Sequence, residues 1–236
     1  MIDIIRSETR GSANHGWLDA KHSFSFADYH DPDRMGFGSL RVINEDRIEA
    51  AMGFGTHPHR DMEIITYIID GALEHKDSMG NGSVIRPGDV QRMTAGTGVL
   101  HSEFNPQEDA STHLLQIWIL PEQNGLTPGY EETSFSDDDK RNQWCLLGSR
   151  DGRGSSVTIH QDVDLAATIL EPGQALDYTF APGRRGYLQV VKGELAFETD
   201  GVEERLKAGD GATIADTDTI RLAAVEESEL LLFDMG

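Results

Sequence analysis

Two short histidine motifs contain the residues best suited to chemistry. The first is His57-Pro-His59, and the second, further along the chain, is His101-Ser-Glu103. Side chains on a β-strand alternate between its two faces, so both members of each motif would point the same way. On neighbouring strands the two motifs would bring together three imidazoles and one carboxylate. This ligand set suits a divalent first-row metal and leaves two open positions on an octahedral ion.

The distribution of histidine supports this interpretation. Eight of the nine histidines precede residue 121, and only His160 follows it. A single His-x-His pair is usually solvated or hydrogen-bonded, but two ligand pairs in one histidine-rich half favour a metal site. His75 and His113 fall in predicted strands, where we expect them to satisfy local hydrogen bonds rather than to bind metal.

The elements that must position these motifs are short strands. Apolar runs bounded by turn residues occupy 62–69, 113–120, 187–191 and 229–233, and 25 glycines and 8 prolines separate such segments. No long stretch has the 3.6-residue period of a helix. The steps Asp70-Gly71 and Asp200-Gly201 suit hairpin turns, and the proline at position 58 implies a strand start or an edge strand. The sequence predicts an all-β fold.

An internal repeat divides the chain. The segment around Gly71 resembles that around Gly193, at an offset of 122 residues, and Gly88-Asp89 corresponds to Gly209-Asp210 at an offset of 121. The same shift places no good ligand opposite the three histidines. We therefore expect two tandem antiparallel β-barrels. The first spans 1–123 and binds the metal, 124–145 is a polar linker, and the second spans 146–236 without metal ligands.

Composition and charge exclude several classes of function. The net charge of −21 argues against direct nucleic-acid binding, because a phosphate backbone requires a basic surface. No apolar run is long enough to span a membrane, and the N-terminus lacks the apolar core of a secretory signal. The single cysteine, Cys145, forms no internal disulfide and has no histidine nearby in sequence. We expect a cytoplasmic protein, and we expect it to be a monomer.

Several stretches together resemble the pirin family of bicupins. They are Gly16–Phe26, Arg41–Asn44, Gly55–Arg60 and Ala95–Asn105. The resemblance implies two packed barrels of the double-stranded β-helix (jelly-roll) type with iron in the first. It also implies that His57, His59, His101 and Glu103 are the ligands, with Fe(II) as the expected metal. Nickel, copper, manganese and zinc fit the same ligands.

The resemblance also implies an activity. Bacterial pirins are similar to quercetin 2,3-dioxygenases, which open a flavonol with O₂ and release carbon monoxide. Glu103 or Glu63 could accept the substrate proton, and Glu63 is also a candidate ligand or support residue. Phe54, Met93 or Trp118 could cover the aromatic ring.

Two other functions stay open from the sequence. One is a non-catalytic metal-binding or redox-sensing regulator that acts through protein partners. The other is a Lewis-acid isomerase or hydrolase. Because imidazoles bind metal only when neutral, we expect metal affinity to fall between about pH 7 and pH 5.

Overall fold

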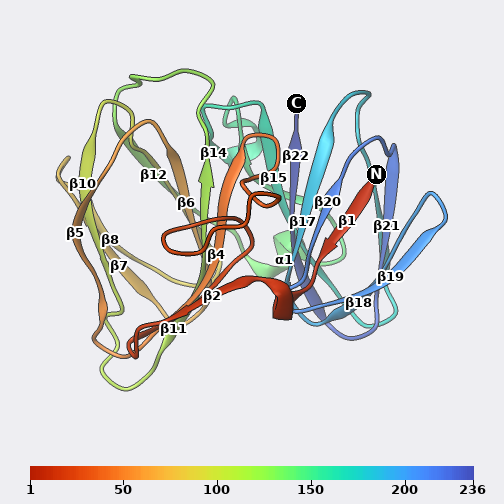
Figure 1. Cartoon of the computed structure of the whole chain (residues 1–236), viewed down its shortest axis with the longest axis horizontal. Helices are drawn as coiled ribbons and strands as arrows, with labels where there is room; N and C mark the ends of the chain where they lie inside the picture. The colour runs from red at the N-terminus through yellow and green to blue at the C-terminus, as the bar shows by residue number, and fades with distance from the viewer. The chain divides into compact units, whose positions relative to one another are not determined.

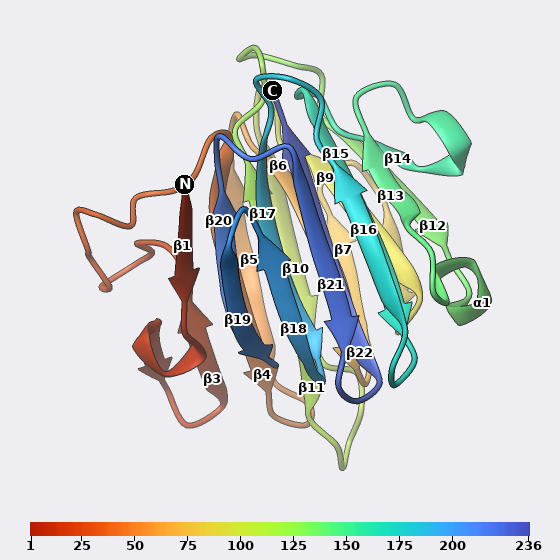
Figure 2. The same ribbon diagram turned by 90° about the vertical axis from the view of Figure 1, so that its right-hand side faces the viewer.

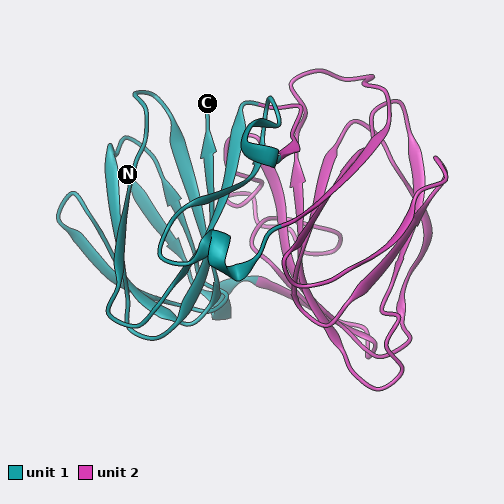
Figure 3. Ribbon diagram, turned by 180° about the vertical axis from the view of Figure 1, so that it is seen from behind, with its two compact units in different colours: residues 1–10, 135–156, 162–236 teal, residues 11–134, 157–161 magenta.

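The chain folds almost entirely into β-strands, which confirms the predicted fold class. The computed structural model describes all of residues 1–236. The only helical segments are α1 (Asp137–Lys140) and two short 3₁₀ turns, η1 (Ser7–Thr9) and η2 (Arg153–Ser155). None of them is long and apolar enough to cross a membrane. The contacts divide the chain into an N-terminal unit, 11–134 with 157–161, and a C-terminal unit, 1–10 with 135–156 and 162–236 (Figure 3).

The N-terminal unit contains two antiparallel sheets (Figure 1). Its larger sheet is made of β2 (Gly11–Asn14), β3 (Leu18–His22), β4 (Leu40–Ile48), β6 (Glu63–Asp70), β9 (Asp89–Thr94), β11 (Thr112–Ile119) and β12 (Gly129–Ser134). The order of these strands is β12-β9-β6-β11-β4-β3-β2. The smaller sheet is made of β5 (Gly53–His59), β7 (Leu73–Asp77), β8 (Gly82–Ile85) and β10 (Val99–Phe104), in the order β5-β10-β7-β8. The two-residue strand β14 (Val157–Thr158) also belongs to this unit.

The C-terminal unit repeats this arrangement. Its larger sheet has β1 (Ile2–Ile5), β13 (Cys145–Ser149), β15 (Val163–Leu170), β17 (Arg185–Lys192), β20 (Gly211–Ile214) and β22 (Ser228–Met235), in the order β1-β20-β17-β22-β15-β13. Its smaller sheet has β16 (Ala175–Thr179), β18 (Glu194–Thr199), β19 (Val202–Lys207) and β21 (Thr219–Ala224). Figure 2 shows these four side by side in the order β16-β21-β18-β19.

The strand orders confirm the predicted repeat. The run β9-β6-β11-β4 in the first unit corresponds to β20-β17-β22-β15 in the second, and β5-β10-β7-β8 corresponds to β16-β21-β18-β19. The four predicted apolar runs are β6, β11, β17 and β22, which lie inside the larger sheets and are almost wholly buried. Burial on both faces explains their unbroken hydrophobicity. The sheets are open in their hydrogen bonding, so a closed barrel stays a prediction.

The two units depart from the predicted boundaries in three places. Residues 1–10 belong to the C-terminal unit, because β1 pairs with β20 from Ile2 opposite Ile214. The expected linker 124–145 contains β12, which pairs with β9, and the helix α1. Segment 157–161 returns to the N-terminal unit. The sequence hides these features because β1 and β12 are short edge strands with partly exposed, mixed side chains.

The two predicted Asp-Gly turns have different roles. Asp200-Gly201 closes a two-residue hairpin in which Thr199 pairs with Val202. Asp70-Gly71 instead connects β6 to β7, which lie in different sheets, so the hairpin predicted there is wrong. A turn residue with positive φ fits both connections, so the dipeptide could not distinguish them.

The glycines after β17 and β18 provide a matched test of steric crowding. Gly193 and Gly201 have nearly equal φ values of 84° and 81°. A Cβ at Gly193 would lie 2.3 Å from the carbonyl oxygen of Glu227, whereas one at Gly201 would meet nothing within 4 Å. We expect Gly201→Ala to cost about 1 kcal/mol of unfolding free energy, from backbone strain alone. Gly193→Ala should cost at least about 2 kcal/mol more. Urea unfolding followed by circular dichroism measures both values, and equal losses would contradict the crowding seen here.

Candidate metal centre

The antiparallel pair β5 and β10 positions both predicted motifs. The register places His101 directly opposite His57 and Glu103 opposite Phe54. From His101 to Glu103 strand β10 advances by two residues, whereas β5 advances by three between their partners. Strand β5 therefore contains one extra residue, which is a β-bulge. Because of this bulge, Phe54 and His57 both line one cavity although strict alternation would place them on opposite faces. Strand β5 ends its sheet, as the proline within it predicted.

The three histidines form a tight cluster. The Nε2 atoms of His57 and His101 lie 3.0 Å apart, and one ligand atom from each of His57, His59 and His101 lies within 4.8 Å of the others. The Nδ1 of His57 lies 2.8 Å from the carbonyl oxygen of Gly55. Since a carbonyl only accepts, Nδ1 of His57 carries the proton and Nε2 presents a lone pair to the cluster.

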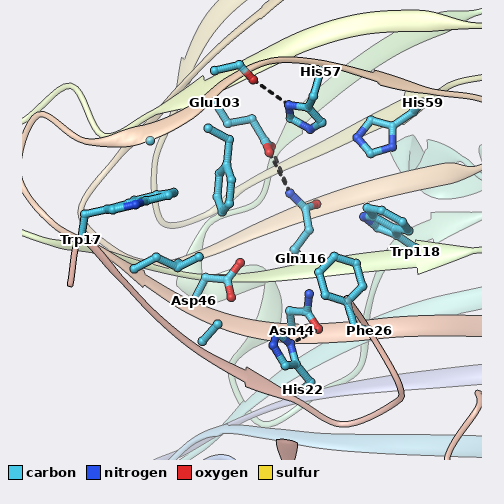
Figure 4. Close-up of a pocket in the computed structure, with 15 residues that line it drawn as sticks. Trp17, His22, Phe26, Asn44, Asp46, His57, His59, Glu103, Gln116 and Trp118 are labelled. Atoms are coloured by element: carbon cyan, nitrogen blue, oxygen red, sulfur yellow. Dashed lines mark hydrogen bonds between the residues drawn. The ribbon is translucent and has the colours of Figure 1, made fainter. Parts of the chain in front are cut away.

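Glu103 lies beside this cluster in a buried position. Its carboxylate accepts two hydrogen bonds from Nε2 of Gln116, at 3.0 and 3.1 Å (Figure 4). A carboxylate oxygen of Glu103 also lies within 4.8 Å of ligand atoms of His75 and His101, in a second group of possible metal ligands. Burial raises the pKa of the Glu103 carboxyl above its usual value, and the hydrogen bond from Gln116 partly opposes this.

His75 lies behind His101 and is fully buried. Its Nε2 is 3.2 Å from a carboxylate oxygen of Asp77, and its Nδ1 is 3.5 Å from Nδ1 of His101. Asp77 is itself held by the side chain and backbone of Asn81. These side-chain contacts, from Asp77 to His75 and from His75 to His101, orient the ring of His101. Sequence reasoning missed this role of His75. The available signal was the His-x-Asp spacing on β7, the strand that pairs with β10. His113, in contrast, pairs with Glu45 at 2.8 Å, away from the cluster.

Glu63 does not line the cavity on which the histidines open. It is fully buried, and its Oε2 accepts hydrogen bonds from Thr94 at 3.1 Å and from the backbone N–H of His160 at 3.2 Å. Nδ1 of His160 also approaches the same oxygen at 3.1 Å. The geometry therefore gives no support to Glu63 as the proton acceptor. The return of segment 157–161, which sequence reasoning missed, brings His160 to Glu63. All nine histidines thus belong to the N-terminal unit.

A cavity of about 380 Å³ opens beside the cluster, within the range of ligand pockets. Its polar residues near the cluster are His57, His59, Glu103 and Gln116, and Figure 4 shows His57, His59 and the Glu103–Gln116 pair on one side of it. Its aromatic walls include two edge-to-face pairs, Trp17 with Phe54 and Phe26 with Trp118. Phe54 and Trp118 thus line the cavity as expected, whereas Met93 is buried elsewhere with Ile64.

Burial keeps the imidazoles of His59 and His101 neutral. Burial lowers the pKa of His101 to about 3, and the neighbouring His57 adds to this effect. Burial also lowers the pKa of His59 to about 4. These two rings therefore take up protons below the window of pH 7 to pH 5 that an unperturbed imidazole predicts. They present lone pairs at neutral pH without first losing a proton.

The donor set fits a divalent cation. Two imidazole nitrogens bound at right angles, each about 2.1 Å from an ion, are about 3 Å apart. The Nε2 atoms of His57 and His101 are separated by 3.0 Å in this structure. Neutral imidazoles beside a buried carboxylate are typical ligands of first-row divalent metals.

The sequence matches known protein families and relatives over nearly its whole length. Residues 5–119 match the Pirin family, and residues 146–235 match the family described as the quercetinase C-terminal cupin domain. The chain is 48% identical to the quercetin 2,3-dioxygenase of Escherichia coli K12, over 100% of this chain and 99% of that one. It is 45% identical to a putative quercetin 2,3-dioxygenase of Pseudomonas aeruginosa, over the full length of both.

A solved structure shares the fold and contains a metal. The bacterial pirin YhhW from Escherichia coli, crystallised in complex with nickel(II), superposes with a TM-score of 0.93 at 47% identity. The alignment covers 100% of this chain and 99% of that one.

The low pKa of His101 predicts that the metal-free protein loses stability in acid. Its imidazole takes up a proton near pH 6.5 in the unfolded chain, but only near pH 3 in the folded one. The stabilisation is therefore complete above pH 6.5 and is lost as the pH falls towards 3, by up to about 1.4 kcal/mol per pH unit. Urea unfolding of the wild type and of His101→Asn at pH 6 and pH 5 tests this. The free energy of unfolding should fall less steeply in the variant, by about 1 kcal/mol per pH unit. Parallel losses would rule out a neutral His101.

Proposed function

Because the chain belongs to the pirin family, we propose that it is a metal-dependent dioxygenase that cleaves a flavonol such as quercetin with O₂ and releases carbon monoxide. The observation that carries this proposal is the aromatic-walled cavity that opens directly onto His57, His59 and Glu103. The similarity to quercetin 2,3-dioxygenases over the whole chain supports the same reaction.

We assign the metal ligands to His57, His59, His101 and Glu103. The hydrogen bond to Gly55 fixes the tautomer of His57, and the buried His75 orients the ring of His101. Fe(II) is the metal that the family resemblance implies, and the nickel complex of a relative supports a divalent ion. A divalent ion held there acts as a Lewis acid and lowers the pKa of a bound substrate hydroxyl.

The protein contributes positioning and proton acceptance. Trp17 with Phe54 and Phe26 with Trp118 form apolar walls that flank a planar ligand and exclude water from it. Of the carboxyl groups at the cavity, Glu103 is the one beside the histidine cluster, so we assign it to accept the proton of the substrate hydroxyl, and its raised pKa suits this task. Gln116 donates to both carboxylate oxygens and so holds Glu103 in place.

The cavity distinguishes catalysis from a regulatory role. A metal that only sensed redox state or stabilised the unit would need no space for an organic ligand. The cluster instead borders about 380 Å³ of cavity, so the regulator that acts through protein partners is not favoured.

The composition of the chain supports a proposal about the cellular setting. We propose that the enzyme works in the cytoplasm as a monomer on a small substrate, without nucleic acid. The free thiol of Cys145 and the net charge of −21 support this setting. We also propose that the two sheets of each unit form a double-stranded β-helix, which the repeated strand order supports.

Nickel binding tests the ligand assignment. Titration of the metal-free protein with Ni(II) in a calorimeter should show affinity at least about 100-fold weaker for His57→Ala, His59→Ala and His101→Ala. His113→Ala is the matched control, because His113 pairs with Glu45 away from the cluster, and it should bind as the wild type does. Wild-type affinity in His59→Ala would move the metal to the alternative group of His75, His101 and Glu103.

Oxygen uptake tests the reaction. Protein reconstituted anaerobically with one equivalent of Fe(II) should consume O₂ when quercetin is added, in step with the loss of quercetin. The double variant His57→Ala/His59→Ala should lose this activity, because two of the proposed ligands are gone. Failure of the wild type to consume O₂ with iron bound would refute the proposed reaction while leaving the metal assignment intact.

A further inference from the structure

A row of polar side chains crosses the larger sheet of the N-terminal unit. The register places His22 opposite Asn44, Asn44 opposite Gln116, and Gln116 opposite Thr66. These four residues are buried, although the inward face of such a sheet is normally apolar. Gln116 already has a role, since it holds Glu103. The polar character of the His22–Asn44 end needs a separate explanation.

This end of the row faces the cavity away from the histidine cluster. His22, Asn44 and Asp46 line the cavity, and Figure 4 shows them opposite His57 and His59. Asp46 follows Asn44 by two residues on the same strand, so both side chains point to one face. Aromatic side chains of the walls lie between these two polar ends (Figure 4).

The contacts of Asn44 indicate which ligand groups would bind there. Its Oδ1 lies 2.8 Å from Nδ1 of His22, so the imidazole donates and the amide oxygen accepts. This bond leaves Nδ2 of Asn44 as a donor, and Figure 4 shows it directed towards the middle of the cavity. Asp46 supplies carboxyl oxygens, which accept hydrogen bonds. A hydroxyl group, which both donates and accepts, matches this combination.

We propose that His22, Asn44 and Asp46 form a hydroxyl-recognition site that selects substrates carrying hydroxyl groups on a ring remote from the metal-binding oxygens. The inference rests on the proposed function in one respect, since it takes a flavonol as the ligand. It makes Asn44 a specificity-determining residue, because its amide contacts the substrate away from the reacting atoms. The site therefore separates polyhydroxylated flavonols from those with a bare remote ring.

Three flavonols probe this site. Quercetin has hydroxyls on both outer rings, galangin lacks those of the phenyl substituent, and a third flavonol lacks those of the fused benzene ring. Binding to the Fe(II)-loaded protein is measured anaerobically by quenching of tryptophan fluorescence, because Trp17 and Trp118 line the cavity. Turnover is measured separately by oxygen uptake. The wild type should prefer quercetin by about tenfold over at least one of the other two.

The variants isolate the amide of Asn44. Asn44→Ala should reduce that preference to less than about threefold, and Asn44→Leu should do the same while keeping the branched shape of the side chain. Glu45→Ala is the matched control, since Glu45 is the next residue on the strand and bonds to His113 on the opposite face. It should keep the wild-type preference in both assays.

Each outcome decides between the two proposals. Equal binding of all three flavonols to the wild type, or an unchanged preference in both Asn44 variants, would overturn the recognition site. Preferential binding without any oxygen uptake would support the site and refute the dioxygenase. Turnover of all three flavonols without any preference would support the dioxygenase and refute the recognition site. If none of the flavonols binds at all, both fail.

Discussion

The pairing of His57 with His101 across β5 and β10 is the contact on which the candidate centre depends. It brings two Nε2 atoms to 3.0 Å, which is the separation of two imidazole nitrogens bound at right angles to one divalent ion. The hydrogen bond from His57 to Gly55 fixes the tautomer on one side, and Asp77 through His75 orients the ring on the other. The bulge in β5 then adds Phe54 to the same face. The smaller sheet thus provides both the cluster and part of its aromatic wall.

The larger sheet provides the opposite wall of the same cavity. Its inward face combines apolar side chains with a polar row from His22 to Thr66, and Gln116 in that row reaches Glu103 on the smaller sheet. Buried polar groups are stable only when hydrogen-bonded, and most of this row bonds to its neighbours. The C-terminal unit repeats the strands without any histidine, so the fold alone does not require these side chains. The confinement of the histidines to one unit therefore reflects the site and not the architecture.

Sequence reasoning succeeded where a local pattern determines the structure. The spacing of the two histidine motifs predicted which side chains share a face, and the long apolar runs predicted the central strands of both larger sheets. It failed where distant pairing decides the outcome. Nothing local indicates that β1 pairs with β20, or that segment 157–161 places His160 against Glu63. The polar strand β12 looked like a linker because its side chains are partly exposed on a sheet edge.

The position of β5 at the edge of its sheet has a consequence for motion. This strand is hydrogen-bonded to β10 alone, so its backbone amides are among the easiest in the unit to open to solvent. A metal that joined side chains of β5 and β10 would act as a cross-link at that edge and suppress local opening. Part of the metal-binding free energy would then order this strand. Amide hydrogen exchange along residues 53–59 would report whether the centre is occupied, independently of any substrate.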